Sequence, residues 1–144
     1  MRCLEPSYNV TLHVADLSIA NETVPVVEKG GKKMNIDNIE YDEDREFFII
    51  HLQERCTVGK SNVTNIQYTA YLKDNLKGFY QSAYKDEKSN TIEYLATTQF
   101  QVTDARRAFP CFDEPGIKAN FKVWVMCMLV YNYMCPRCNS GEPW

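Results

Sequence analysis

Asp113 and Glu114 are neighbouring carboxylates, and a pair of this kind could support catalysis. Two carboxylates can share acid and base roles when both face one substrate. Adjacent side chains on an extended segment point apart, however, and no nucleophile or metal ligand accompanies this pair. The same segment holds further charges and two prolines: Asp104, Arg106, Arg107, Pro110 and Pro115. We expect these charges to pair and brace a loop whose backbone the prolines restrict.

Cysteine and histidine form no complete metal or nucleophile motif. Cys111 has no adjacent histidine, so we expect a buried structural thiol rather than a nucleophile. Cys135 and Cys138 have the spacing of half a zinc knuckle or of a redox pair, but no second pair follows them. We interpret them as incidental to an irregular tail. His13 and His51 are not spaced as zinc ligands on a helix, so the sequence predicts no catalytic residue and no metal ligand.

Gln99 and Gln101 are a polar pair on a predicted strand. Because alternate side chains of a strand share a face, both amides would lie together while Phe100 points away. The carbonyl oxygen of an amide can accept a hydrogen bond from an ammonium group. Taken alone, the pair is typical of exposed strand residues.

Apolar alternation and turn residues predict the elements that must position these side chains. We expect strands at residues 10–15, 24–27, 34–41, 47–52, 65–72, 78–84 and 92–101. The run at 47–52 is apolar on both faces, which favours a central strand covered from two sides. Residues 85–90 are typical of a hairpin connection, and Thr103 is a candidate cap for one helical turn ending at Arg107. Such short strands predict an antiparallel β-sandwich or barrel.

The bulk properties are those of one globular domain or part of one. The chain has 144 residues, 44% of them hydrophobic, and a net charge of −3. This charge gives no reason to expect nucleic acid as a partner. No apolar run is long enough to cross a membrane as a helix, and polar residues interrupt the place where a signal peptide would have its apolar region. We therefore expect no transmembrane segment in this chain.

Three Asn-x-Thr triplets begin at Asn9, Asn21 and Asn62. This pattern is the acceptor for N-glycosylation, which occurs only in the secretory pathway. The triplets therefore favour an extracellular or cell-surface location.

Residues 94–115 read YLATTQFQVTDARRAFPCFDEP, which closely resembles the signature of the N-terminal domain of the zinc aminopeptidases of the aminopeptidase N family. Residues 78–82 (GFYQS), 12–17 and 118–121 are similar to other segments of that domain. The resemblance covers residues 9–123. It leaves residues 1–8 as a non-matching leader and residues 124–144 as a divergent tail rich in cysteine and methionine.

The resemblance implies an all-β fold, an antiparallel, saddle-like β-sandwich that we expect to be incomplete at both ends. It also implies hydrolysis of peptides from the free N-terminus, with zinc held by a catalytic domain whose Gly-x-Met-Glu-Asn and His-Glu-x-x-His motifs are absent from this chain. In the family, the residue matching Gln99 borders the pocket for the first side chain of the substrate. The residue matching Gln101 accepts a hydrogen bond from its α-amino group.

Two functions follow as hypotheses. The first is a part of a zinc aminopeptidase that supplies the N-terminal-domain wall of the substrate cleft and is inactive alone. The alternative is a non-catalytic, secreted β-sandwich that binds a full-length aminopeptidase or another partner through its open sheet edges.

Overall fold

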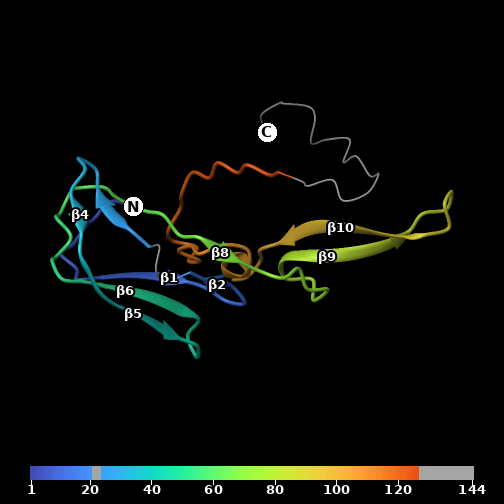
Figure 1. The fold of residues 1–144 in the computed structure, drawn as a ribbon, viewed down its shortest axis with the longest axis horizontal. Helices are drawn as coiled ribbons and strands as arrows, with labels where there is room; N and C mark the ends of the chain where they lie inside the picture. The colour runs from blue at the N-terminus through green and yellow to red at the C-terminus, as the bar shows by residue number, and fades with distance from the viewer. Residues whose placement is uncertain (21–23, 127–144) are drawn as a thin grey trace.

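Every regular element in the described parts of the chain, residues 1–20 and 24–126 of the computed structural model, is a short strand apart from one 3-10 turn (Figure 1). The strands are β1 (Asn9–His13), β2 (Ser18–Ile19), β3 (Val26–Glu28), β4 (Lys33–Met34), β5 (Ile36–Asp42), β6 (Phe47–Leu52), β7 (Asn62–Thr64), β8 (Tyr68–Thr69), β9 (Gly78–Lys85) and β10 (Ile92–Gln99). The 3-10 turn η2 spans Ala105–Arg107. All strand pairs are antiparallel, which confirms the all-β prediction.

Two three-stranded sheets, ordered β1-β6-β5 and β4-β3-β7, enclose the core. Phe48 and Ile50 of β6 and Val26 of β3 have no exposed surface and belong to one apolar cluster that also contains Leu12 and Met34. Side chains of opposed sheets that interdigitate in this way form a β-sandwich. The alternation of buried apolar residues in the sequence therefore decides which face of each sheet turns inward.

The β6 strand is central in its sheet, as predicted, with β1 on one side and β5 on the other. Its inward face, with Phe48, Ile50 and Leu52, is buried. The opposite face, with Phe47, Ile49 and His51, is only half-buried, so the prediction of full cover on both sides holds for one face only.

The β9 and β10 strands form a hairpin that projects from the rest of the described chain (Figure 1). Its register runs from Gly78 opposite Gln99 to Lys85 opposite Ile92. In the connection, the Asp86 carboxylate accepts hydrogen bonds from the Ser89 hydroxyl and the Ser89 backbone N–H. The predicted hairpin and its solvated connection are confirmed.

Two local predictions were wrong, and one strand was missed. The alternation over residues 65–72 produces only β8, because β8 pairs with the two residues of β2 and has no longer partner. The short strand β7 was not predicted at all, although it completes the second sheet beside β3. Asp104, not Thr103, is the N-cap residue of η2, and its side chain makes no capping hydrogen bond.

Candidate functional site

Gln99 and Gln101 are both exposed, but they do not share one strand. The β10 strand ends at Gln99, and Gln101 lies in the turn of residues 101–104 that leads to η2. The prediction that both amides lie on one strand face is therefore wrong. The reason lies in the partner strand: Gly78, opposite Gln99, is the first residue of β9, so Gln101 has no residue to pair with.

Two adjacent arginines hold the segment that follows this turn. The arginines are Arg106 and Arg107, and they pair with four carboxylates, those of Asp16, Glu46, Asp104 and Asp113. We call these six residues the arginine clasp. Its members come from the β1–β2 connection, the turn between β5 and β6, and the loop around η2. The clasp therefore joins three segments that are far apart in the sequence.

Arg106 is the buried arginine of the clasp, with 9% of its surface exposed. Its Nε donates to Asp113 Oδ2 at 3.0 Å and its Nη1 donates to Glu46 Oε2 at 3.0 Å. The Asp113 carboxylate also accepts from the Arg106 backbone N–H at 3.3 Å. A guanidinium group can serve two carboxylates at once because its donors form a planar fork.

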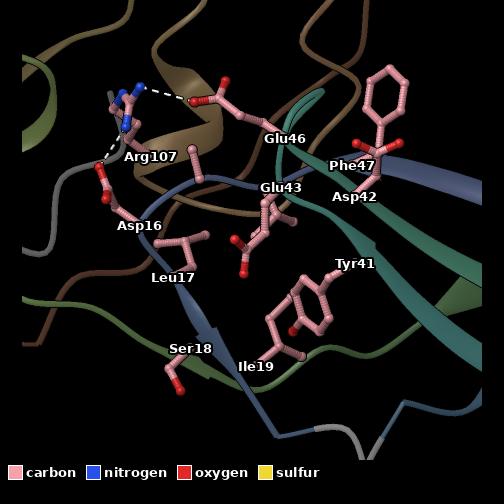
Figure 2. Close-up of a pocket in the computed structure, with 12 residues that line it drawn as sticks. Asp16, Leu17, Ser18, Ile19, Tyr41, Asp42, Glu43, Glu46, Phe47 and Arg107 are labelled. Carbon is pink, nitrogen blue, oxygen red and sulfur yellow. Dashed lines mark hydrogen bonds and ion pairs between the residues drawn. The ribbon is translucent and has the colours of Figure 1, made fainter.

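Arg107 gathers three further carboxylate contacts. Its Nη2 donates to Glu46 Oε1 at 3.0 Å and its Nη1 donates to Asp16 (Figure 2). Its Nε donates to Asp104 Oδ1 at 3.0 Å. Asp16 also pairs with Lys73, and this hydrogen bond, followed by that of Arg107, lowers the pKa of Asp16. The predicted bracing of the loop by mixed charges is confirmed.

Asp16 and Glu46, the clasp members outside the predicted segment, both have left-handed backbone conformations, with φ of 58° and 57°. Such a conformation costs a residue other than glycine roughly 1–2 kcal/mol. The ion pairs with the two arginines offset that cost. No local pattern in the sequence indicates either partner, because Asp16 lies 91 positions from Arg107 and Glu46 lies 60 positions from Arg106.

Asp113 and Glu114 point to different partners, as expected of neighbours on an extended segment. Asp113 faces Arg106, whereas Glu114 Oε1 lies 3.5 Å from His13 Nε2. The Asp113 backbone N–H donates to His13 Nδ1 at 3.2 Å, so the proton of a neutral His13 ring lies on Nε2, toward Glu114. This arrangement gives no paired carboxylates around a common substrate position.

Cys111 is half-buried and forms backbone hydrogen bonds in both directions with His13. Burial, followed by the charge of Asp113, raises the pKa of the Cys111 thiol to about 11. The thiol therefore keeps its proton near neutral pH and is a poor nucleophile. Its role in the described structure is to bring residues 111–114 beside the end of β1.

A hollow of about 700 Å³ lies beside the clasp, between the β1–β2 connection and the turn after β5 (Figure 2). Its wall includes the apolar side chains of Leu17 and Ile19 and the aromatic side chain of Tyr41. Its carboxylates are Asp16, Asp42, Glu43 and Glu46. Three of these four already pair with arginine or lysine side chains, so the hollow offers little free negative charge.

Zinc does not fit the side chains that the structure describes. Within residues 1–20 and 24–126, no three His, Cys, Asp or Glu side chains converge as a group that could hold a metal ion. His13 and His51 lie at opposite ends of the ladder between β1 and β6, and His51 is occupied by Asn9 and Glu40. Cys135 and Cys138 lie outside the described residues. In the described part of the chain, no helix has the length and apolarity to cross a membrane.

The glycosylation triplets differ in accessibility. Asn9 is exposed at the start of β1, and its Oδ1 atom lies 2.9 Å from His51 Nδ1. Asn62 is only 2% exposed, and its Oδ1 atom has no hydrogen-bond partner among the described residues. A glycan on Asn62 would require β7 to open. Asn21 lies outside the described residues.

Sequence comparison identifies the family. The family model of the Peptidase M1 N-terminal domain matches residues 1–131. The chain belongs to this family. Aminopeptidase N of Bos taurus is 35% identical over 125 residues, which are 84% of this chain and 13% of the relative. Aminopeptidase N of Mus musculus is 42% identical over 112 residues, which are 76% of this chain and 11% of the relative.

A shorter and more similar match lies in a yeast protein. Aminopeptidase 2, mitochondrial, of Saccharomyces cerevisiae is 52% identical over 59 residues, which are 41% of this chain and 6% of the relative. The chain thus spans a small part of the length of each of these M1 relatives. Membership confirms the resemblance carried by residues 94–115, and the clasp gives the charged residues of that segment a structural role.

Proposed function

We propose that this chain forms the N-terminal-domain wall of the substrate cleft of an M1 zinc aminopeptidase, with Gln99 and Gln101 facing the first residue of a bound peptide. The observation that carries the proposal is the placement of these amides. They are exposed where the hairpin ends, directly before the segment that the clasp holds. Exposed polar groups on a braced turn can contact a ligand with little loss of conformational freedom.

The chemistry of the first residue of a peptide suits these amides. The Gln101 carbonyl oxygen can accept a hydrogen bond from the α-ammonium group, which leaves the remaining donors for carboxylates of a catalytic domain. Gln99 would border the pocket for the first side chain. A peptide with a blocked amino group would leave a buried acceptor unpaired, at roughly 1–3 kcal/mol. The zinc belongs to a catalytic domain outside this chain, and we assign no step of hydrolysis to the residues described.

A chimeric enzyme tests the substrate contact. The segment of Mus musculus Aminopeptidase N that matches this chain would be replaced by the residues of this chain, and kcat/KM would be measured on an aminoacyl reporter. We expect Gln101→Ala to lower kcat/KM roughly tenfold, because one hydrogen bond to a charged group is lost. Thr98→Ala is the matched control, since Thr98 is exposed on the opposite face of β10 from Gln99. An unchanged kcat/KM in Gln101→Ala would exclude the contact.

The isolated chain should not hydrolyse peptides. We expect no turnover of an aminoacyl reporter by the purified chain, with or without added zinc. Turnover that copurifies with the chain and disappears with a chelator would overturn this part of the proposal.

The alternative function, a secreted binding module, has one observation in its favour. The outer edge of β10 pairs with no other strand among the described residues, and Phe79, Ile92 and Tyr94 are exposed on one face of the hairpin. Unpaired edges and apolar faces are the features through which a sheet adds a strand from a partner. Co-elution of the chain with a full-length aminopeptidase would favour this alternative, and separate elution would remove it.

A further inference from the structure

The first residues of the chain run beside the loop that follows β6. The Cys3 backbone N–H donates to the Lys60 carbonyl at 2.9 Å, and the Gly59 N–H donates to the Cys3 carbonyl at 2.9 Å. The Cys56 N–H donates to the Ser7 carbonyl at 2.9 Å. These backbone hydrogen bonds fix residues 3–7 against residues 56–60.

This alignment brings two cysteines together that are 53 positions apart in the sequence. The Cys3 Sγ atom lies 3.5 Å from the Cys56 carbonyl oxygen and 3.0 Å from the Glu5 carbonyl oxygen. Cys56 is 6% exposed, whereas Cys3 is half-buried. Burial, and then the nearby Cys3 thiol through its charge and a hydrogen bond, raises the pKa of Cys56. The two thiols are therefore neighbours in the folded chain.

We propose that Cys3 and Cys56 form a disulfide when the folded chain meets a small-molecule disulfide such as that of glutathione. The glycosylation triplet at Asn9 favours a secretory route, and in that compartment disulfides form and persist. The other described cysteine, Cys111, is held against His13 and lacks a neighbouring thiol to pair with in the described structure.

The exchange balances without another oxidant. The Cys3 thiol loses its proton and its sulfur attacks one sulfur of the small-molecule disulfide, which releases one small thiol and leaves a mixed disulfide. The Cys56 thiol then loses its proton and attacks the Cys3 sulfur, which releases the second small thiol. Both protein thiols are oxidised, and one small-molecule disulfide is reduced to two thiols. Because the pKa of Cys56 is raised, less of this thiol is ionised near neutral pH, and the second step becomes faster as the pH rises into the mildly alkaline range.

Peptide mapping of the unsubstituted chain tests the proposal. The full chain, produced in bacteria and purified with reduced thiols, would be incubated with glutathione disulfide, alkylated, and digested with trypsin without reduction. Trypsin releases Cys3 in the peptide of residues 3–29 and Cys56 in that of residues 56–60. We expect most of these two peptides to be recovered as one linked species. Recovery of both as separate alkylated peptides, or of Cys56 linked to another cysteine, would overturn the proposal.

Variants and a folding control separate the native pairing from chance oxidation. Cys3→Ser and Cys56→Ser should each abolish the linked species and leave the other thiol free for alkylation, whereas Cys111→Ser should retain it. The same incubation in concentrated urea should give a lower yield of the 3–29 and 56–60 pair, since unfolding removes the alignment. An equal yield in urea would contradict a pairing that the fold directs. The oxidised chain should also have a higher urea midpoint than the reduced chain, because the cross-link restricts the unfolded state.

Discussion

Gly78 and Arg107 lie so close together that a Cβ atom on Gly78 would meet the Cβ atom of Arg107 at 2.7 Å. Gly78 also has a φ of +67° and lies opposite Gln99 in the hairpin. Two features therefore disfavour any side chain at this position: the left-handed backbone conformation and the close contact with Arg107. The contact ties the start of β9, and with it the end of β10, to the arginine clasp.

Replacement of Gly78 by alanine should therefore destabilise the chain more than the same change at another left-handed glycine. Gly59→Ala is the matched control, since Gly59 has a φ of +81° and no atom would lie within 4 Å of its added Cβ. We expect Gly59→Ala to lower the free energy of unfolding by about 1–2 kcal/mol, from backbone strain alone. For Gly78→Ala we expect a loss that is larger by roughly 1–3 kcal/mol, because the added methyl group must displace Arg107 or the 3-10 turn. Urea unfolding of both variants measures the difference, and equal losses would show that the contact is easily relieved.

Arg106→Ala should lower the free energy of unfolding by about 3 kcal/mol, because it leaves the Glu46 and Asp113 carboxylates without their shared partner. Arg106→Lys should recover part of this loss, since an ammonium group is a point charge and cannot reproduce the fork. The control is Arg45→Ala, whose side chain is 69% exposed and pairs with Asp42. That change should cost less than about 1 kcal/mol in urea unfolding. A loss for Arg106→Ala as small as that of the control would contradict a stabilising role for the clasp.

The lowered pKa of Asp16 gives its ion pairs a pH dependence with a defined sign. Its pKa in the unfolded chain is near the ordinary value of 3.8, and contact with Lys73 and then Arg107 lowers it in the fold. The stabilisation is therefore fully present above pH 3.8 and is lost as the pH falls through the lower, folded-state pKa.

Asp16→Asn tests this sign, and asparagine also tolerates the left-handed conformation of this position. At neutral pH we expect the variant to be less stable by up to about 1 kcal/mol, because the pairs are partly exposed to solvent. The difference between the two proteins should shrink as the pH falls below 3.8, which urea unfolding at a series of pH values would measure. A difference that grows in acid would contradict the assignment.

The hairpin and the core could be predicted from the sequence because their signals are local. Apolar alternation in residues 47–52 identifies the buried face of β6, and a polar connection between two β-prone runs identifies β9 and β10. The clasp could be predicted only in part. Charges near Arg106 and Arg107 suggested mutual pairing, but Glu46 enters from a turn 60 positions away from Arg106 and nothing near it in the sequence indicates that role.

The placement of Gln101 shows a second limit of local patterns. Period-two alternation predicts which side chains share a face only while the strand continues. The strand ends where its partner ends, and that partner begins at Gly78, which packs closely against Arg107 of the 3-10 turn. The family resemblance identified the functional segment without predicting this geometry.

Phe48→Ala should be the most damaging of the core substitutions, because Phe48 has no exposed surface in the centre of the apolar cluster. We expect a loss of roughly 3–5 kcal/mol, which is a large part of the stability of a typical domain. Phe79→Ala is the matched control, since Phe79 is 43% exposed on the hairpin. In urea unfolding, Phe79→Ala should lower the free energy of unfolding by well under half as much as Phe48→Ala. Comparable losses would show that the hairpin face is covered in solution.

Glycosylation offers a direct measure of the accessible surface. If the chain is secreted from a eukaryotic cell, we expect the folded product to carry a glycan at Asn9 and an unmodified Asn62, which is 2% exposed. The Asn9 Oδ1 atom keeps its contact with His51 in the glycosylated form, since the sugar is attached to the amide nitrogen. Mass spectrometry of glycopeptides measures both sites, and a high occupancy of Asn62 in folded protein would contradict the burial of the Asn62 side chain.

The clasp and the bridge between His13 and Cys111 also set the order of events during synthesis. The Asp113 N–H donates to His13 Nδ1 across 100 positions of sequence, and Arg107 reaches Asp16 across 91. On the ribosome, β1 and β6 can meet early, but the contacts that hold the end of the first strand must wait until residues 106–113 have been translated. Until then a nascent chain has neither arginine beside Glu46 and only Lys73 as a partner for Asp16, and an interruption of translation before codon 104 yields a product without the two arginines of the clasp.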